Sequence, residues 1–238
     1  MKIEVLEDAA AVARRAAEVI AAAAQNAAES RGRFTLAVSG GATPWAMLRA
    51  LADKKIHWER VWVVQVDERV VPAGHAERNL THLRSSLIAH APLRPDQVHA
   101  MPVEASDLED AAKHYARALE SIAGAPPVLD FVHLGLGADG HTASLVPGDP
   151  VLGVTDADVG LTGIYQGARR MTLTYPIINR SRQALWVVTG GGKAEMLARL
   201  CSGDRSIPAG CVRRDHALVL ADRAAAAKLA TTRDEIDV

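Results

Sequence analysis

The sequence has few cysteines and almost no excess charge. Its two cysteines, Cys201 and Cys211, belong to no CxxC pair, which argues against a disulfide framework and against a zinc site built on thiolates. The formal net charge is -1, so no overall field gathers nucleic acid or anionic lipid, and an anionic ligand must be held by local geometry. We therefore expect neither nucleic acid nor a membrane as a partner, whereas a small phosphorylated molecule fits this charge balance.

The sequence also lacks a long apolar run. It begins MKIEVLEDAA, without a charged and then apolar leader, and arginine, glutamate and amide residues interrupt the alanine-rich stretch 9–28. We expect no signal peptide and no membrane span, and hence a cytoplasmic location.

Three catalytic signatures are missing as well. The sequence contains no HExxH zinc helix, no GxSxG nucleophile turn and no cluster of cysteine and histidine ligands. These absences argue against metal-assisted hydrolysis and against acyl-serine chemistry. They leave a histidine that activates water.

The composition that is present is typical of a globular enzyme. Apolar residues make up 49% of the chain and charged residues 23%, and 238 residues are enough to bury a sizeable core. No repeat, low-complexity tract or Pro/Ser-rich linker divides the sequence, so we predict a single domain over residues 1–238. We interpret residues 153–160 as a surface loop and not as a domain boundary.

Apolar runs rich in Val, Leu and Ile alternate with helical segments along the chain. This pattern predicts an α/β fold with a largely parallel sheet that helices cover on both faces. Asp8 is a candidate cap of the first helix, and Gly32 ends it. The expected helices are 9–29, 76–90, 107–123, 193–201 and one that closes the chain, and the expected strands are 34–41, 61–68, 129–137, 170–176, 184–190 and 216–222.

The motif SGGATP, residues 39–44, lies where a predicted strand passes into a predicted helix. Its glycines allow close approach of the backbone, and the helix dipole favours an anion, most naturally a phosphate. Thr43 is a candidate N-cap, and Pro44 fits the first helical position. The alternative is a glycine turn that binds nothing. The candidate phosphate-binding residues here are Ser39, Gly40, Gly41, Ala42 and Thr43.

The motif DERVVP, residues 67–72, also follows an apolar strand. The carboxyl end of a strand is where α/β enzymes present functional side chains, so we expect Asp67, Glu68 and Arg69 to project into the ligand crevice. The alternative is a solvated loop.

The segment GLGADGHTASLVP, residues 135–147, follows a strand that should be central. Its glycines match the dinucleotide fingerprint GxGxxG, but His141 and Thr142 follow where that fingerprint requires a helix, so we do not expect nicotinamide binding. Instead we interpret the glycines as a tight loop that presents Asp139 and His141. Histidine is the side chain best suited to general-base chemistry near neutral pH, and the alternative is a loop histidine without a role.

Basic residues near the C-terminal half complete the candidate site. Lys193 follows three glycines, but Val187 and Ala194 occupy positions where a phosphate-binding Walker motif needs a glycine and a hydroxyl residue. We expect Lys193 to begin a helix and to contribute charge to an anion site, with a solvated surface lysine as the alternative. Either Arg169 or Arg170, which precede a predicted strand, could face the ligand.

Together with RMTLTYPIIN (170–179) and GGGKAEML (190–197), these motifs resemble the 6-phosphogluconolactonase family in order and spacing over essentially the whole chain. The resemblance implies a three-layer αβα sandwich with a mostly parallel, Rossmann-like central sheet, a fold shared with glucosamine-6-phosphate deaminases and pentose-phosphate isomerases. It also implies hydrolysis of 6-phosphoglucono-1,5-lactone to 6-phosphogluconate, with no cofactor and no metal.

By position, the resemblance implies roles for individual residues. His141 matches the general base, Asp139 its neighbour in the loop, and Arg69 the arginine near the lactone. The chain departs from the family at Val146, where phenylalanine is common, and at Arg78, where serine is common, which leaves the role of Asn79 open. Ser39 to Thr43, Arg170 and Lys193 match phosphate-side positions, and Asp67 and Asn79 are further candidate substrate-binding residues.

Two other functions compete with this one. A glucosamine-6-phosphate deaminase shares the phosphate loop and the DGH loop, but its pattern has a glutamate where this chain has Val146 and an aromatic residue where it has Arg69. A sugar-phosphate sensor without catalysis would keep SGGATP and Lys193 but would not need His141. The expected partner is a small sugar phosphate, and the expected state is a monomer or a weak homo-oligomer.

Overall fold

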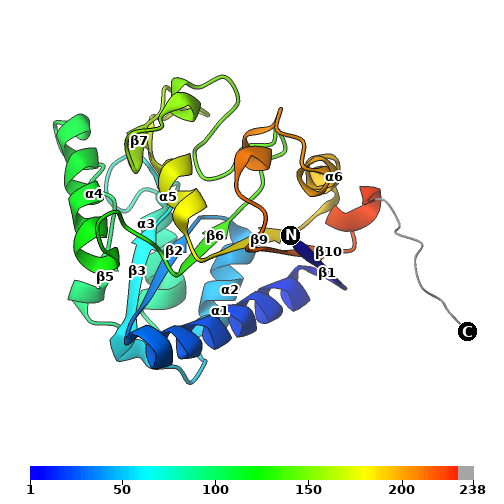
Figure 1. Ribbon diagram of the computed structural model, residues 1–238, viewed down its shortest axis with the longest axis horizontal. Helices are drawn as coiled ribbons and strands as arrows, with labels where there is room; N and C mark the ends of the chain where they lie inside the picture. Colours follow the sequence, from blue (N-terminus) through cyan, green and yellow to red (C-terminus); the bar gives the residue numbers. More distant parts are fainter. Residues whose placement is uncertain (230–238) are drawn as a thin grey trace, which may run out of the picture.

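The structure, a computed structural model, describes residues 1–229 and is built around a seven-stranded sheet (Figure 1). The strand order is β1-β10-β9-β6-β2-β3-β5, and all neighbouring strands run parallel. The predicted α/β fold with a mostly parallel sheet is therefore confirmed. The strands are β1 (Lys2–Leu6), β2 (Phe34–Val38), β3 (Val61–Gln65), β5 (Val98–His99), β6 (Phe131–Leu134), β9 (Gln183–Val188) and β10 (Ala217–Asp222).

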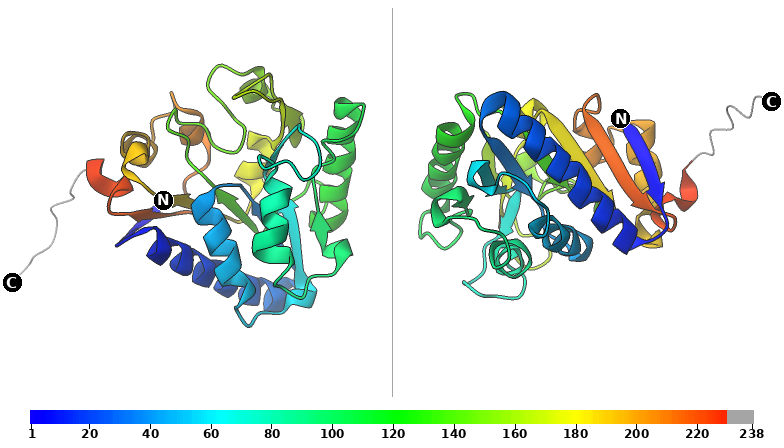
Figure 2. Two further views of the ribbon diagram at one scale, coloured as in Figure 1. Left: turned by 180° about the vertical axis from the view of Figure 1, so that it is seen from behind. Right: turned by 90° about the horizontal axis from the view of Figure 1, so that it is seen from below.

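Helices cover both faces of this sheet. In Figure 1, α1 (Ala9–Arg31) and α2 (Ala42–Ala52) lie below the sheet, and Figure 2 shows α1 running across the strands. On the opposite face lie α4 (Leu108–Ala123), α5 (Tyr175–Arg180) and α6 (Ala194–Ser202). Every residue of β2 and β6 is buried between these layers, as expected for central parallel strands. The three-layer αβα arrangement is confirmed.

The first helix begins and ends where the sequence predicts. The Asp8 side chain accepts a hydrogen bond from the Ala11 amide, and Gly32 ends the helix with a left-handed φ of 73°. The start of α2 differs from the prediction. Gly41 is its N-cap, so Thr43 is the second helical residue and not the cap, and Pro44 occupies the third position and not the first.

A second, smaller sheet is the main departure from the expected elements. Its strands β4 (Asp67–Arg69), β8 (Arg170–Leu173) and β7 (Val159–Leu161) pair antiparallel in that order. The strand predicted over 61–68 therefore breaks at Val66. Its amide donates to Val38 in the large sheet, and its carbonyl accepts from Leu173 in the small sheet. The strand predicted over 170–176 ends at Leu173 in this small sheet, and its last two residues begin α5. The loop predicted over 153–160 already contains the start of β7.

Further elements were mispredicted or missed, among them the two-residue strand β5 and the helix α5, neither of which was predicted. The short edge strand β1 was not expected; it is five residues long, and Lys2, Ile3 and Val5 are exposed. The helix predicted over 76–90 is α3 (Asn79–Leu83) followed by a π-helical turn, Arg84–Ile88. The closing helix is a 3-10 turn, Ala225–Lys228, within the described residues, and the rest of that prediction falls outside them.

The order of the strands fixes where a ligand can bind. From β2 the chain passes outward through β3 to β5, then returns to β6 on the other side of β2 and continues outward through β9 to β10. The carboxyl ends of β2 and β6 thus flank the topological switch point, where the strand order reverses. Ligands of such sheets usually bind in the crevice at this point. Within residues 1–229, no helix is long and apolar enough to cross a bilayer.

Candidate active site

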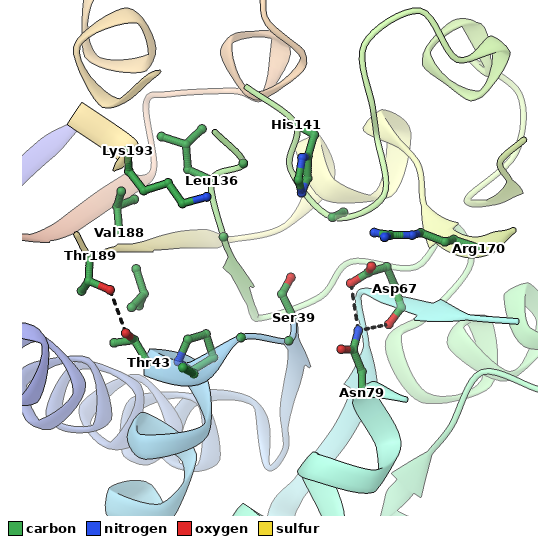
Figure 3. Close-up of a pocket in the computed structure, with 18 of the residues that line it drawn as sticks. Ser39, Thr43, Asp67, Asn79, Leu136, His141, Arg170, Val188, Thr189 and Lys193 are labelled. Atoms are coloured by element: carbon green, nitrogen blue, oxygen red, sulfur yellow. Dashed lines mark hydrogen bonds between the residues drawn. The ribbon is translucent and has the colours of Figure 1, made fainter. Parts of the chain in front are cut away.

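A pocket of about 280 Å³ opens at this switch point (Figure 3). The segments that follow β2, β3, β6 and β9 all contribute to its lining. The structure brings every residue of the predicted site to this pocket except Asp139, which lies behind His141. The predicted residues that line it are Ser39, Gly40, Gly41, Ala42, Thr43, Asp67, Arg69, Asn79, His141, Arg170 and Lys193.

His141 and Asp139 form a hydrogen-bonded pair in the loop after β6. The imidazole Nδ1 lies 2.6 Å from Asp139 Oδ1, and the same oxygen accepts from the His141 backbone amide at 3.2 Å. Gly137 makes this approach possible, because a Cβ there would lie 2.0 Å from His141 Nδ1 and 2.5 Å from Asp139 Oδ1. Only glycine at position 137 therefore leaves room for the His141 and Asp139 side chains to contact each other next to the backbone.

The charge of Asp139 sets the tautomer of the histidine. Burial alone would raise the pKa of Asp139, but hydrogen bonds from the Tyr165 hydroxyl, at 2.8 Å, and from His141 outweigh it and lower that pKa. The ionised carboxylate is an acceptor only, so in the neutral imidazole the proton lies on Nδ1 and the lone pair on Nε2. Figure 3 shows the imidazole reaching into the pocket. Tyr165 was missed by the sequence analysis, because it lies in a hairpin that was not predicted.

The SGGATP loop presents the start of α2 to the pocket. Gly41 has a φ of 131° and caps the helix without a side chain, so the first amides of α2 have no capping oxygen. The Thr43 hydroxyl contacts the Thr189 hydroxyl at 2.8 Å, which ties the loop to the end of β9. These features make the loop a suitable anion cradle.

Ser39 was predicted to bind phosphate, but both its hydrogen-bond donors are bound to His133. Its amide donates to His133 Nδ1 at 3.2 Å and its hydroxyl donates to the His133 carbonyl at 3.1 Å, so both donors are already used. Complete burial lowers the pKa of His133 to about 3, so this imidazole is neutral and can accept the Ser39 amide. His133 was not singled out in the sequence, because it lies within an apolar strand without any motif.

Glu68 is the residue of the DERVVP motif whose predicted position is wrong. Its side chain is fully buried and does not project into the crevice. The carboxylate accepts hydrogen bonds of 2.8 Å from the backbone amides of Arg69, Asn79 and Leu80. It also accepts 2.9 Å from Gln65 and pairs with Arg78 at 3.3 Å. Glu68 therefore holds the start of α3 against β4, and Arg78, which departs from the family pattern, neutralises it from below.

Asn79 joins three sides of the pocket. Its Oδ1 accepts from Arg69 Nη1 at 2.6 Å, and its Nδ2 donates to the Asp67 carbonyl at 2.9 Å. Gly40 packs directly against it, since a Cβ on Gly40 would lie 2.0 Å from Asn79 Oδ1. Asn79 thus fixes the Arg69 guanidinium relative to the SGGATP loop.

Arg170, and not Arg169, faces the pocket. Arg169 Nε donates to the Thr162 carbonyl at 3.2 Å, whereas Arg170 lines the pocket opposite Arg69 in the register of β8 and β4. Burial, together with the positive charge of Arg69, lowers the pKa of Arg170. Asp67 lies nearby and accepts from the Ser144 hydroxyl at 2.7 Å.

The pocket has a positive balance of charge. Among the described residues that line it, Arg69, Arg170 and Lys193 are cations, and Asp67 is the only carboxylate. Lys193 ends the 3-10 turn Gly191–Lys193 before α6, and Figure 3 shows its ammonium group reaching into the pocket. Residues 1–229 hold no group of three or more His, Cys, Asp or Glu side chains that could bind a metal ion. The site is therefore suited to an anionic ligand.

Comparison with known proteins agrees with this geometry. The family model of glucosamine-6-phosphate isomerases/6-phosphogluconolactonase matches residues 7–220. The chain belongs to this family. A 6-phosphogluconolactonase of Mycobacterium tuberculosis is 37% identical over 241 residues, which covers 95% of this chain and 98% of that protein. The chain is thus an enzyme of the family.

Solved structures of the family share the fold. The 6-phosphogluconolactonase of Thermotoga maritima superposes with a TM-score of 0.82 at 28% identity, covering 93% of this chain and 98% of that one. A monomeric glucosamine-6-phosphate deaminase superposes with a TM-score of 0.84 at 19% identity, covering 96% of this chain and 100% of that one. The fold is therefore common to both branches of the family and does not separate them.

Replacing Glu68 by Gln tests the role of the buried carboxylate. The amide cannot accept all the hydrogen bonds and leaves Arg78 without its buried counter-charge, so we expect the free energy of unfolding to fall by about 2–4 kcal/mol. Urea denaturation measures this change. The matched control is Glu104→Gln, which removes the other carboxylate partner of Arg78, 55% exposed, and should change the midpoint little. Equal effects of the two changes would refute the assignment.

Replacing Gly40 by Ala tests the contact between the loop and Asn79. The added methyl group must displace Asn79, and with it Arg69, so we expect kcat/KM to fall at least about 100-fold while the protein still folds. Steady-state kinetics and circular dichroism measure the two effects. Gly153→Ala, where a Cβ meets nothing within 4 Å, is the control and should leave kcat/KM unchanged.

Proposed function

We propose that the protein hydrolyses 6-phospho-D-glucono-1,5-lactone to 6-phospho-D-gluconate, a step in the oxidative branch of the pentose phosphate pathway. The names of its relatives in Mycobacterium tuberculosis and Thermotoga maritima support this activity. The observation that carries the proposal is an imidazole, oriented by Asp139, that opens on the same cationic pocket as Arg69 and Lys193.

The reaction would use His141 as the general base. Its Nε2 takes a proton from water as the water oxygen attacks C1 of the lactone, and the resulting imidazolium is stabilised by the Asp139 carboxylate. The carbonyl oxygen becomes an oxyanion, which Arg69 stabilises from its fixed position beside Asn79. When the C1–O5 bond breaks, the imidazolium returns its proton to the leaving ring oxygen. A lactone is an activated ester, so one base and good positioning suffice.

We assign the substrate phosphate to the side of the pocket formed by the SGGATP loop and Lys193. Figure 3 shows Lys193 on the same side as Thr43, and Arg170 on the other side beside Asp67 and Asn79, with His141 between them. With the phosphate bound at the SGGATP loop, Arg170 lies at the opposite end of the substrate, which we call the sugar end, and contacts it there. Arg170 thus remains a predicted substrate-binding residue, but next to Arg69 and not beside the phosphate.

A glucosamine-6-phosphate deaminase remains the competing activity, because the fold is common to both. Val146, which replaces a glutamate of the deaminase pattern, is buried and does not line the pocket. Ammonia release from glucosamine 6-phosphate would reverse the choice, and ligand-induced thermal stabilisation without turnover would support a sensor. A cytoplasmic location, a state of monomer or weak homo-oligomer, and a lack of nucleic-acid partners stay predictions from the sequence.

The decisive assay generates the lactone in situ with glucose-6-phosphate dehydrogenase, in buffer that contains a chelator. We expect the wild-type protein to accelerate appearance of the gluconate, because the proposed mechanism uses no metal. We expect His141→Ala to reduce kcat by about 10²- to 10⁴-fold, the range typical of a lost general base, without loss of fold. His114→Ala, an exposed histidine on α4, is the control. A His141→Ala protein with full activity would overturn the mechanism.

Lys193→Ala tests where the phosphate binds. Removing one charge-assisted contact of about 1.5–3 kcal/mol should raise KM for the phosphorylated lactone by about 10- to 100-fold. Glucono-1,5-lactone, which lacks the phosphate, should be hydrolysed slowly and equally by both proteins. The control is Lys113→Ala on the exposed face of α4. An equal loss with both lactones would show that Lys193 acts elsewhere.

A further inference from the structure

The hairpin between β7 and β8 places Tyr165 and Gln166 beside the His141–Asp139 pair. Tyr165 and Ala168 form a backbone bridge, and Gln166 and Gly167 between them have φ values of 50° and 84°. Two successive positive φ values are those of a tight type I′ turn, which fixes where both side chains begin. Positive φ is uncommon for a residue other than glycine, so the glutamine is held there at some cost in backbone energy.

The side chains of this turn connect the pair to Arg170 by a chain of hydrogen bonds. Arg170 Nη2 donates to Gln166 Oε1 at 3.1 Å, and Gln166 Nε2 donates to the Tyr165 hydroxyl at 3.3 Å. The Tyr165 hydroxyl in turn donates to Asp139 Oδ2 at 2.8 Å, while the other oxygen of Asp139 contacts His141 Nδ1. Each group thus acts in a donor or acceptor role that its chemistry allows.

The ring of Tyr165 makes two further contacts. The Arg170 guanidinium carbon lies 4.8 Å from the ring centroid, a cation–π distance, and the His141 ring meets the tyrosine edge at 5.5 Å between centroids. Tyr165 does not line the pocket, so it acts on substrate only through these neighbours.

We propose that Tyr165 is a positioning residue that couples the orientation of the His141–Asp139 pair to that of Arg170. The hydroxyl group orients the base, and the ring together with Gln166 orients the arginine. Binding of the sugar end by Arg170 therefore sets the catalytic pair at the same time. The inference rests on the proposed function for its kinetic meaning, whereas the coupling itself is a property of the free protein.

The charges around the imidazole give the direction of a pH effect. Asp139 faces its Nδ1 from the same loop, Tyr165 from the hairpin, and Arg170, Arg69 and Lys193 bring positive charge from β8, β4 and the start of α6. Burial and the carboxylate of Asp139 raise the pKa of Tyr165, so its hydroxyl stays a donor at neutral pH. Without that donor, more of the negative charge of Asp139 is directed at the imidazole, which favours the protonated ring.

The test compares Tyr165→Phe with Tyr175→Phe. Tyr165→Phe keeps the ring over Arg170 and removes only the hydroxyl, so we expect kcat to fall about tenfold, KM to stay within about twofold, and the rising limb of the pH–kcat profile to move up by roughly 0.5 pH unit. Tyr175, at the start of α5, donates its hydroxyl to the Pro208 carbonyl, so Tyr175→Phe removes a hydroxyl outside the site and should change none of these.

Gln166→Asn completes the test on the arginine side. Asn tolerates positive φ but is too short to bridge Arg170 and Tyr165, so we expect KM to rise about threefold with kcat nearly unchanged. A split of this kind, kcat for Tyr165 and KM for Gln166, is not produced by general destabilisation.

NMR titration of the His141 ring nitrogens in the free protein separates this inference from the proposed function. The titration midpoint should rise in Tyr165→Phe and stay constant in Tyr175→Phe. If the wild-type protein has no lactonase activity but the midpoint still rises in Tyr165→Phe, the proposed function is rejected and the coupling is kept. A Tyr165→Phe protein with wild-type kcat, pH profile and imidazole titration would overturn the coupling.

Discussion

The parallel pairing of β2 with β6 is the constraint on which the site depends. The chain leaves β2 toward one edge of the sheet and later leaves β6 toward the other, so no crossover helix covers the groove between their carboxyl ends. The SGGATP loop begins at the end of β2 and the DGH loop at the end of β6. Gly41 of the SGGATP loop and the His141 imidazole are 100 residues apart in sequence. They lie at the same pocket because the buried strands β2 and β6 are neighbours in the sheet.

Buried hydrogen bonding then fixes the side chains that the strands deliver. Glu68 uses its carboxylate on backbone amides at the start of α3, and this leaves Asn79 free to hold Arg69. His133 accepts both hydrogen bonds that Ser39 can donate and so holds the start of the SGGATP loop. Buried hydrogen bonds thus tie together the residues at the base of the pocket, and the orientation of Arg69 is set by the neutral side chain of Asn79.

The sequence was sufficient to predict the layers, most strand positions and the pocket-lining residues, because glycine motifs at strand ends report backbone requirements directly. It was not sufficient where tertiary contacts decide. Glu68 reads as a solvated charge until α3 is placed against it, and Tyr165 lies in a hairpin whose strands are only three or four residues long. The edge strand β1 gives only a weak signal in the sequence, because it is five residues long and packs in the sheet through pairing with β10.

The small antiparallel sheet has one consequence of its own. It sets Arg69 and Arg170 directly opposite each other, and two like charges in such a cross-strand pair repel. A bound anion shared by the two guanidinium groups removes that repulsion, so occupancy by a sugar acid should make the whole chain harder to melt. Relief of the repulsion between Arg69 on β4 and Arg170 on β8 thus contributes to the binding free energy of an anionic ligand.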